Sequence, residues 1–255
     1  SEDMIEFMFD FSRELSTTFA NLKELQSCKC EYYHKLRKMH SALPPFTYPF
    51  IIKGYRYFGN NENKLNELFK ILESLTFRYY LISSRADINS RLSEVIRSFN
   101  GDLDALRSSL LKKLNDSWYW GDTKCKETLS GWMYENPVLH YLLWEYEESI
   151  QGKGYKIGNI KIENEQIEHL SPQTEPNEAI AAGYDVDENN TYSDDFRENY
   201  LNSLGNLMLI SGSHNASIGN TPFVDKLNSY MNRPLRNQQA EIKAFWDEGK
   251  NEWKM

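Results

Sequence analysis

The stretch that decides the fold is Ile167-Glu168-His169-Leu170-Ser171-Pro172-Gln173. A second stretch complements it, namely Leu204-Gly205-Asn206-Leu207-Met208-Leu209 with His214-Asn215-Ala216-Ser217. The first places a carboxylate beside an imidazole at the end of a short apolar strand. The second supplies two asparagines, one entering a strand and one just before a helix. Adjacent strand residues point to opposite faces, so Glu168 and His169 can share a site only where the strand ends, as Pro172 indicates.

These residue types fit the hydrolysis of a phosphodiester by a site with one metal ion. The reaction needs a base that takes a proton from water and a cation that offsets the charge on the phosphate. His169 suits the first task because the pKa of histidine lies near neutrality. Glu168 and Asn215 suit the second, since Mg²⁺ prefers oxygen ligands and needs few from the protein.

The two stretches have the outline of an HNH, or ββα-metal, finger. Together with Phe223-Val224-Asp225-Lys226 and Tyr230 they resemble the C-terminal HNH-like nuclease domain of GmrSD-type modification-dependent restriction enzymes. They are also similar to SspE-type anti-phage nucleases. The motifs run from Ile167 to Tyr230, and the helical stretch before them resembles the segment that precedes the nuclease domain in that family.

The resemblance implies a role for each matching residue. His169 is implied to be the general base, and Glu168 and Asn215 the ligands of Mg²⁺ or Mn²⁺. Asn206 is implied to brace the loop that bears the base, and Lys226 to meet a phosphate or the transition-state charge. The family's Pro-Gln ending is matched by Gln173, which is implied to order the loop.

Plain structural interpretations stand beside these roles. Asn215 or Ser213 fits the N-cap of a helix, where a short polar side chain accepts a backbone N–H. Lys226 fits an exposed lysine with its amine in water. His214, beside Asn215, is a further ligand candidate that the family pattern does not require.

Composition narrows the classes of protein. The chain has 255 residues, 40% hydrophobic and 26% charged, enough for one large or two modest domains. No apolar run approaches the roughly 20 residues of a membrane span, and no signal peptide is apparent at the start, so we expect no membrane partner and a cytoplasmic location. Cys28, Cys30 and Cys125 form no paired motif, which indicates reduced thiols and no structural zinc.

Hydrophobic periodicity predicts a mainly α fold with a small α+β element. We expect a helical domain over 1–155 and the HNH-like finger domain over 156–255. Helical spacing is clear in two segments, around Ile5 to Leu15 and Leu65 to Leu75, and a helix should run from Pro137 to Ile150. Breaks between helices are expected at Pro44-Pro45 with Pro49, Gly59-Asn60-Asn61, Asp87, Asn100-Gly101-Asp102, Asp116 and Asn136-Pro137.

The second half is expected to contain smaller elements. A hairpin is expected within 152–162, finger strands over 167–170 and 207–210, and an acidic loop over 174–192. Helices are expected from Ser193 to Ser203, at Asn215 or its neighbours, over 222–230 and over 238–253.

Charge opposes a simple DNA-binding interpretation. From Lys156 onward there are nine Lys and Arg against sixteen Asp and Glu, so this part carries seven of the eight net negative charges. Phosphate contacts from cations dominate affinity for nucleic acid. The acidic loop could screen the site, and the helical half offers cations that either contact phosphate or form a solvated face: Arg78, Arg85, Arg91, Arg97, Arg107 and Lys112-Lys113.

The sequence therefore predicts a divalent-metal-dependent DNA endonuclease or nickase that restricts foreign or modified DNA. Full-length relatives carry an N-terminal ParB-like nucleotide-handling domain, and nothing in this sequence resembles it. We expect the chain to be the C-terminal part of a larger protein with that domain and DNA as partners. Two other hypotheses stay open: a catalytically silent binding or regulatory module that contacts a basic protein, and an RNase.

Overall fold

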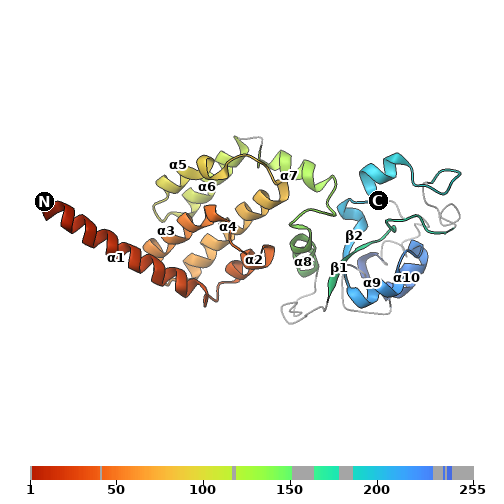
Figure 1. The fold of residues 1–255 in the computed structure, drawn as a ribbon, viewed down its shortest axis with the longest axis horizontal. Coiled ribbons are helices and arrows are strands. Elements are labelled where there is room, and N and C mark those ends of the chain that lie inside the picture. Colours follow the sequence, from red (N-terminus) through yellow and green to blue (C-terminus); the bar gives the residue numbers. More distant parts are fainter. Residues whose placement is uncertain are drawn as a thin grey trace. The chain divides into compact units, whose positions relative to one another are not determined.

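The computed structural model describes residues 2–40, 42–116, 119–150, 164–177, 186–231, 238 and 240–242. The chain divides into two compact units, Ser1–Cys125 and Lys126–Met255 (Figure 1). Its described part is mainly helical, with one two-stranded sheet, as expected. None of the helices in this part combines the length and the apolarity that a membrane span requires. The predicted domain boundary at 155/156 falls outside the described residues and stays a prediction.

The first unit is built from helices alone within the described residues. They are α1 (Glu2–Leu25), α2 (Glu31–Met39), the 3₁₀ turn η1 (Pro45–Thr47), α3 (Tyr48–Phe58), α4 (Glu62–Ile82), α5 (Ile88–Ser98) and α6 (Leu103–Asn115). A further helix, α7 (Asp122–Leu129), crosses into the second unit.

The expected breaks between these helices are confirmed, and most are helix caps. The side chains of Asn61, Asp87 and Asp102 accept backbone N–H groups at the starts of α4, α5 and α6. Each satisfies a donor that the first helical turn leaves without a partner. Gly59 ends α3 with a positive φ of 52°, a conformation that glycine adopts without steric cost.

Helix α4 lies at the centre of the first core. Its residues Leu65, Leu68, Phe69, Leu72 and Leu75 are all buried and follow the spacing that predicted the helix. The helix packs closely on α3, where a side chain added at Gly54 would collide with Leu68. All three cysteines are free, so no disulfide links these helices.

Helix α1 differs from the others because much of its apolar surface is exposed. Its last turns join the core through Leu22 and Leu25, whereas its first turns extend beyond the other helices of the unit (Figure 1). The exposed apolar side chains of α1 are Met4, Ile5, Phe7, Met8, Phe9, Phe11, Leu15 and Phe19.

The second unit combines helices with the small sheet. Its described elements are α8 (Leu139–Ser149), β1 (Glu165–His169), the π-helical turn η3 (Phe196–Tyr200), the 3₁₀ turn η4 (Leu204–Asn206), β2 (Leu207–Ser211), α9 (Gly212–Ile218) and α10 (Phe223–Met231). The two strands are antiparallel and lie side by side, with α9 and α10 next to them (Figure 1). A second core joins β2 to α10 through Met208, Ile210, Phe223, Leu227 and Tyr230.

Most predicted elements of this unit are present. The helix expected from Pro137 begins two residues later, and both finger strands and the helix over 222–230 agree within two residues. The helix expected from Ser193 is mainly a π-helical turn, whose first N–H bonds the Ser193 hydroxyl. The hairpin within 152–162 lies outside the described residues, as does most of the helix over 238–253.

Candidate active site

The end of β1 positions the carboxylate and the imidazole. Glu168 pairs with Met208 across the sheet, and His169, the last residue of β1, pairs with Leu207. Both residues are buried, at 3% and 5% exposed over the whole residue. The strand ends here because the backbone N–H of Leu170 bonds the carbonyl of Asn206 and Pro172 follows.

Glu168 is held by two residues of α10. Its Oε1 accepts a hydrogen bond from Lys226 Nζ at 2.7 Å and another from the Tyr230 hydroxyl at 3.0 Å. Lys226 also donates to the carbonyl oxygen of His169 at 2.8 Å. At 1% exposed, Lys226 is a buried residue, so the interpretation of this residue as an exposed lysine was wrong. The carboxylate provides the charge that makes burial of the amine tolerable.

Burial and pairing act on this carboxylate in opposite directions. Burial raises the pKa of Glu168, whereas the charge and hydrogen bond of Lys226 and the hydrogen bond of Tyr230 lower it. Burial likewise lowers the pKa of Lys226, and the attraction of Glu168 opposes the shift. Each group therefore depends on the other to stay charged in a site that is largely shielded from water.

His169 is held in one orientation by its surroundings. Its Nε2 lies 3.1 Å from Oδ1 of Asn202, and its ring packs on Tyr134 at 4.5 Å between centroids. Because an amide oxygen only accepts, Nε2 carries the proton and Nδ1 keeps its lone pair. Burial lowers the pKa of His169, the hydrogen bond of Asn202 opposes the shift, and the charge of Lys226 adds to it. Burial therefore favours the neutral form of the ring.

Asn206 joins the segment after β1 to the segment before β2. Its Oδ1 accepts from the backbone N–H of Ser171 at 2.7 Å, and its Nδ2 donates to the carbonyls of Ser171 and Leu201 at 3.1 and 2.8 Å. The side chain is fully buried. It thus fixes the backbone two residues after His169 and one residue before Asn202.

The passage from β2 into α9 contains no loop. Ser211 ends the strand, and its hydroxyl accepts the backbone N–H of His214 as the N-cap of α9. The interpretation of Asn215 or Ser213 as N-cap was therefore wrong, because the helix starts earlier than the sequence suggested. Asn215 lies within the first turns, and its Nδ2 donates to Oε1 of Gln166 on β1 at 2.7 Å.

Gly212 is required at this junction. A Cβ at this position would lie 2.7 Å from the carbonyl oxygen of Asn164, closer than real Cβ contacts approach. The lack of a side chain therefore allows α9 to pack directly on the start of β1.

An open cavity of about 320 Å³ unites four of the five site residues that the sequence predicted: Glu168, His169, Asn215 and Lys226 line it. Tyr134, Gln166 and Gln173 also contribute to its walls. Asn206 lies outside the lining and supports it from behind through Ser171. The roles assigned to the five residues stay predictions, but four share one cavity and the fifth orders its backbone.

The structure places His214 and Gln173 differently from the roles considered for them in the sequence analysis. His214 is buried and its Nε2 lies 2.5 Å from the Ser229 hydroxyl, so it ties α9 to α10 and does not line the cavity. Gln173 lines the cavity as an exposed residue. The hydrogen bonds that order its loop come from Asn206 and from the Tyr192 hydroxyl, which donates to the Pro172 carbonyl at 2.9 Å.

Sequence reasoning missed three residues that touch the predicted ones. Asn202 and Tyr134 contact His169, and Gln166 contacts Asn215. Gln166 could have been found, because it lies two residues before Glu168 and hence on the same face of the strand. No local pattern identifies Asn202 or Tyr134, since their contacts with His169 depend on how the chain folds.

The donor atoms fit a hard divalent cation. Oε1 of Glu168 is engaged by Lys226 and Tyr230, while no hydrogen bond to Oε2 occurs within the described residues. In Asn215 the amide nitrogen bonds Gln166, which leaves Oδ1 as the free acceptor. One carboxylate oxygen and one amide oxygen are a donor set suited to Mg²⁺ or Mn²⁺, which keep waters and take further oxygens from a phosphate.

Comparison of the sequence with curated proteins and with solved structures gave no match. Comparison with protein families gave a match to the C-terminal domain of GmrSD restriction endonucleases over residues 119–253. This range is more than half of the chain, and it includes both strands, α9, α10 and all residues of the cavity described above. By this match the chain belongs to the GmrSD restriction endonuclease family, of which it contains the C-terminal domain.

Proposed function

We propose that the chain is a divalent-metal-dependent DNA endonuclease or nickase that hydrolyses phosphodiester bonds in the restriction of foreign or modified DNA. The observation that carries the proposal is the single cavity lined by Glu168, His169, Asn215 and Lys226. Membership of a restriction endonuclease family supports it. The site would have an HNH-like ββα form, with β1, β2 and α9 as its three elements.

In this mechanism His169 is the general base. With its proton on Nε2 held by Asn202, the lone pair of Nδ1 accepts a proton from water. The water oxygen then forms a bond to phosphorus as the bond to the 3′ oxygen breaks. Burial favours the neutral ring, so the base is available without prior deprotonation.

Glu168 and Asn215 would hold Mg²⁺ or Mn²⁺, which supplies positive charge to the phosphate and to the leaving oxygen. Lys226 and Tyr230 keep the carboxylate of Glu168 in one orientation. Because Lys226 already offsets the charge of Glu168, the protein presents few net negative charges to the ion. We therefore expect the phosphate of the substrate to complete the ion's binding, with weak binding in the absence of DNA.

Conversion of supercoiled plasmid tests the proposal. With Mg²⁺ or Mn²⁺ we expect nicked or linear product, and with EDTA none. His169→Ala should abolish cleavage while the circular dichroism spectrum and melting temperature remain those of a folded protein. The matched control is His34→Ala, which removes an exposed histidine of the first unit and should leave the rate unchanged.

Metal binding is tested separately by calorimetry with Mn²⁺ and a duplex oligonucleotide. Glu168→Gln and Asn215→Ala should each weaken the metal dependence of cleavage and of DNA binding. Full cleavage by folded His169→Ala would remove the mechanism. A folded parent protein that cleaves with neither metal, alone or joined to the family's N-terminal domain, would support the silent-module hypothesis instead.

Partners and location belong to the same proposal. DNA would be the substrate, and an N-terminal nucleotide-handling domain of the same protein would control cleavage. The cytoplasm, where foreign DNA arrives, is the expected location. An RNA of the same length as the DNA duplex serves as the competing substrate. Cleavage of one or the other distinguishes the DNA endonuclease hypothesis from the RNase hypothesis.

A further inference from the structure

A polar cavity of about 450 Å³ in the first unit has no part in the proposed nuclease site. Its walls come from α5, from α6 and from Tyr119 and Trp120, which precede α7. Arg91, Arg97 and Lys113 line it, three of the cations that the sequence offered as phosphate contacts. The fold therefore gathers three basic side chains from two helices around one hollow.

Two of the residues that line this cavity each carry a buried N–H group without a partner. These groups are Nε1 of Trp120 and Nε of Arg91. Only one other buried side-chain polar atom in the described part of the chain is without a hydrogen bond, the hydroxyl of Thr76. Unpaired buried donors are rare in proteins because their loss of water is not compensated, so two beside one cavity call for an explanation.

The charges around the cavity favour an anion. Its two acids are engaged: Asp87 caps α5 by accepting the N–H of Asn89, and Glu94 accepts Lys113 at 3.0 Å. Within the described residues no hydrogen bond or ion pair involves the guanidinium groups of Arg91 and Arg97. The lining holds three cations and two carboxylates, with Glu94 attracting Arg97 as well as Lys113, so the net charge of the cavity is positive.

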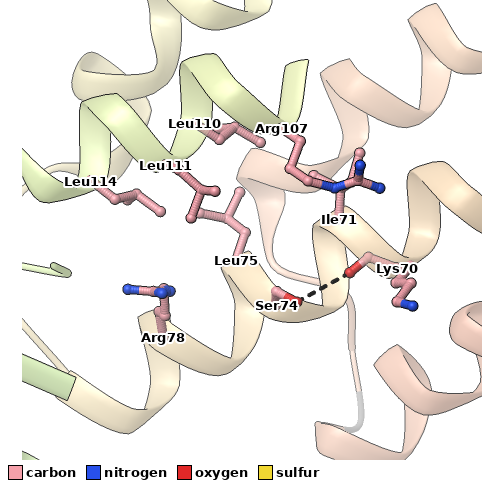
Figure 2. Close-up of a pocket in the computed structure, with 9 residues that line it drawn as sticks. All are labelled: Lys70, Ile71, Ser74, Leu75, Arg78, Arg107, Leu110, Leu111 and Leu114. Carbon is pink, nitrogen blue, oxygen red and sulfur yellow. Dashed lines mark hydrogen bonds between the residues drawn. The ribbon is translucent and has the colours of Figure 1, made fainter. Parts of the chain in front are cut away.

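A second cavity in the same unit shows that basic residues alone do not make such a site. Figure 2 shows Arg78, Arg107 and Lys70 around a hollow of about 240 Å³ between α4 and α6. Five of its nine lining residues are apolar, namely Ile71, Leu75, Leu110, Leu111 and Leu114. Arg78 is engaged by Asp122 and by the Trp120 carbonyl, and Arg107 by Asp104. No unpaired buried donor lies in that cavity within the described residues.

We propose that the cavity formed by α5, α6 and Trp120 binds an oxyanion of the phosphate class, with Trp120 Nε1 and the guanidinium groups of Arg91 and Arg97 as its donors. A phosphate has enough acceptor oxygens to pair with all of them, and planar guanidinium groups match its geometry. Because both unpaired nitrogens are buried, side chains that line the cavity shift when the anion reaches them. The anion is either a backbone phosphate of DNA or a free phosphate or nucleotide.

Nuclear magnetic resonance of the tryptophan indole N–H groups tests the proposal on the full chain. The chain has six tryptophans, and the signal that disappears in Trp120→Phe identifies the residue. Sodium phosphate is titrated against sodium chloride at constant ionic strength and without divalent metal. We expect the Trp120 signal alone to move, and to saturate.

Variants locate the binding groups. Arg91→Gln should weaken phosphate binding at least tenfold, and Arg97→Gln should weaken it less because that side chain is exposed. Arg107→Gln removes an equal charge from the cavity in Figure 2 and should change binding less than twofold. If Trp120→Phe does not fold, calorimetric titration of the parent and the two arginine variants with phosphate decides the question.

Anisotropy of a labelled duplex in EDTA identifies the source of the anion. If the cavity takes a DNA phosphate, Arg91→Gln weakens duplex binding several-fold. It also reduces the slope of log affinity against log salt concentration by about one. If duplex binding is unchanged while phosphate binding is lost, the cavity takes a free phosphate or nucleotide. The proposal is overturned if neither phosphate nor duplex moves the Trp120 signal, or if Arg91→Gln alters neither affinity. Since the measurements need no cleavage, they stand apart from the nuclease proposal.

Discussion

The ammonium group of Lys226 lies 2.7 Å from Oε1 of Glu168, and the two side chains are only 2% and 4% exposed. An ion pair buried to this degree loses the hydration of both charges, so it adds little stability compared with apolar residues of similar size. Removal of one partner destabilises the fold, because it leaves the other charge buried without a counter-charge. The pair therefore matters most for the orientation and the charge of the proposed metal ligand.

The first prediction concerns this pair. Lys226→Met should lower the free energy of unfolding by roughly 3–5 kcal/mol, because the Glu168 carboxylate remains without a cation. Urea denaturation at neutral pH, without metal, measures the loss. The control is the double variant Lys226→Met with Glu168→Gln, which removes both charges and should recover much of the stability. Equal losses in the single and the double variant would contradict the ion-pair account.

The second prediction concerns Asn202, which contacts His169. Asn202→Ala removes the acceptor that fixes the proton on Nε2, so the ring can adopt the unproductive tautomer. We expect kcat to fall on the order of 10–100-fold, the usual cost when a group that orients a site histidine is lost, with little change in KM. A merely structural role would lower stability and leave the pH profile alone. The hydrogen bond raises the pKa of His169, so its loss should also move the acid limb of the profile to lower pH.

The third prediction follows from the lowered pKa of His169 itself. Burial favours the neutral ring, so the acid limb of kcat should lie below the ordinary histidine value of 6.5. The stability that His169 contributes also decreases as the pH falls. The unfolded chain takes up a proton before the folded one as the pH falls. The contribution of His169 is therefore complete above about 6.5 and is lost as the pH falls through the lowered folded pKa.

Two profiles check this third prediction. Cleavage is measured between pH 5 and 8 with the metal concentration held constant, and the unfolding free energy is measured over the same range. His169→Gln should flatten the stability profile in the region where the parent protein loses stability. An acid limb of kcat above 6.5 would show that the site raises the pKa of the base.

The fourth prediction concerns Asn206 as a positioning residue. Asn206→Ala leaves the N–H and carbonyl of Ser171 and the carbonyl of Leu201 without their partner, at a cost of roughly 1–3 kcal/mol for each buried group. Asn206→Asp keeps the acceptor for the N–H but sets a buried carboxylate oxygen against two carbonyl oxygens, so we expect a loss of stability at least as large. At temperatures where both variants stay folded, kcat should fall while the pH profile keeps its shape. A shift of the profile would instead indicate direct contact with the base.

Much of this arrangement was predictable from the sequence because its signals are local. Capping residues such as Asn61 and Asp102 mark helix starts, and the apolar spacing of α4 marks its buried face. The adjacency of Glu168 and His169 at a strand end likewise suggested a site. The burial of Lys226 could not be predicted, since an isolated lysine normally keeps its amine in water and only the tertiary fold brings Glu168 to it. The early start of α9 was missed because Ser211, Ser213 and Asn215 are all residue types that commonly cap a helix.

The direct passage from β2 into α9 also bears on which cation the site can accept. Glu168 lies on β1, which pairs with β2, and Asn215 lies on α9, which follows β2 at Ser211 and Gly212 without a loop. A larger ion with more ligands, such as Ca²⁺, gains its affinity from loops that adjust around it. A strand pair joined directly to a helix offers no such adjustment, so the proposed site would discriminate among cations by radius and would bind Ca²⁺ more weakly than Mg²⁺ or Mn²⁺.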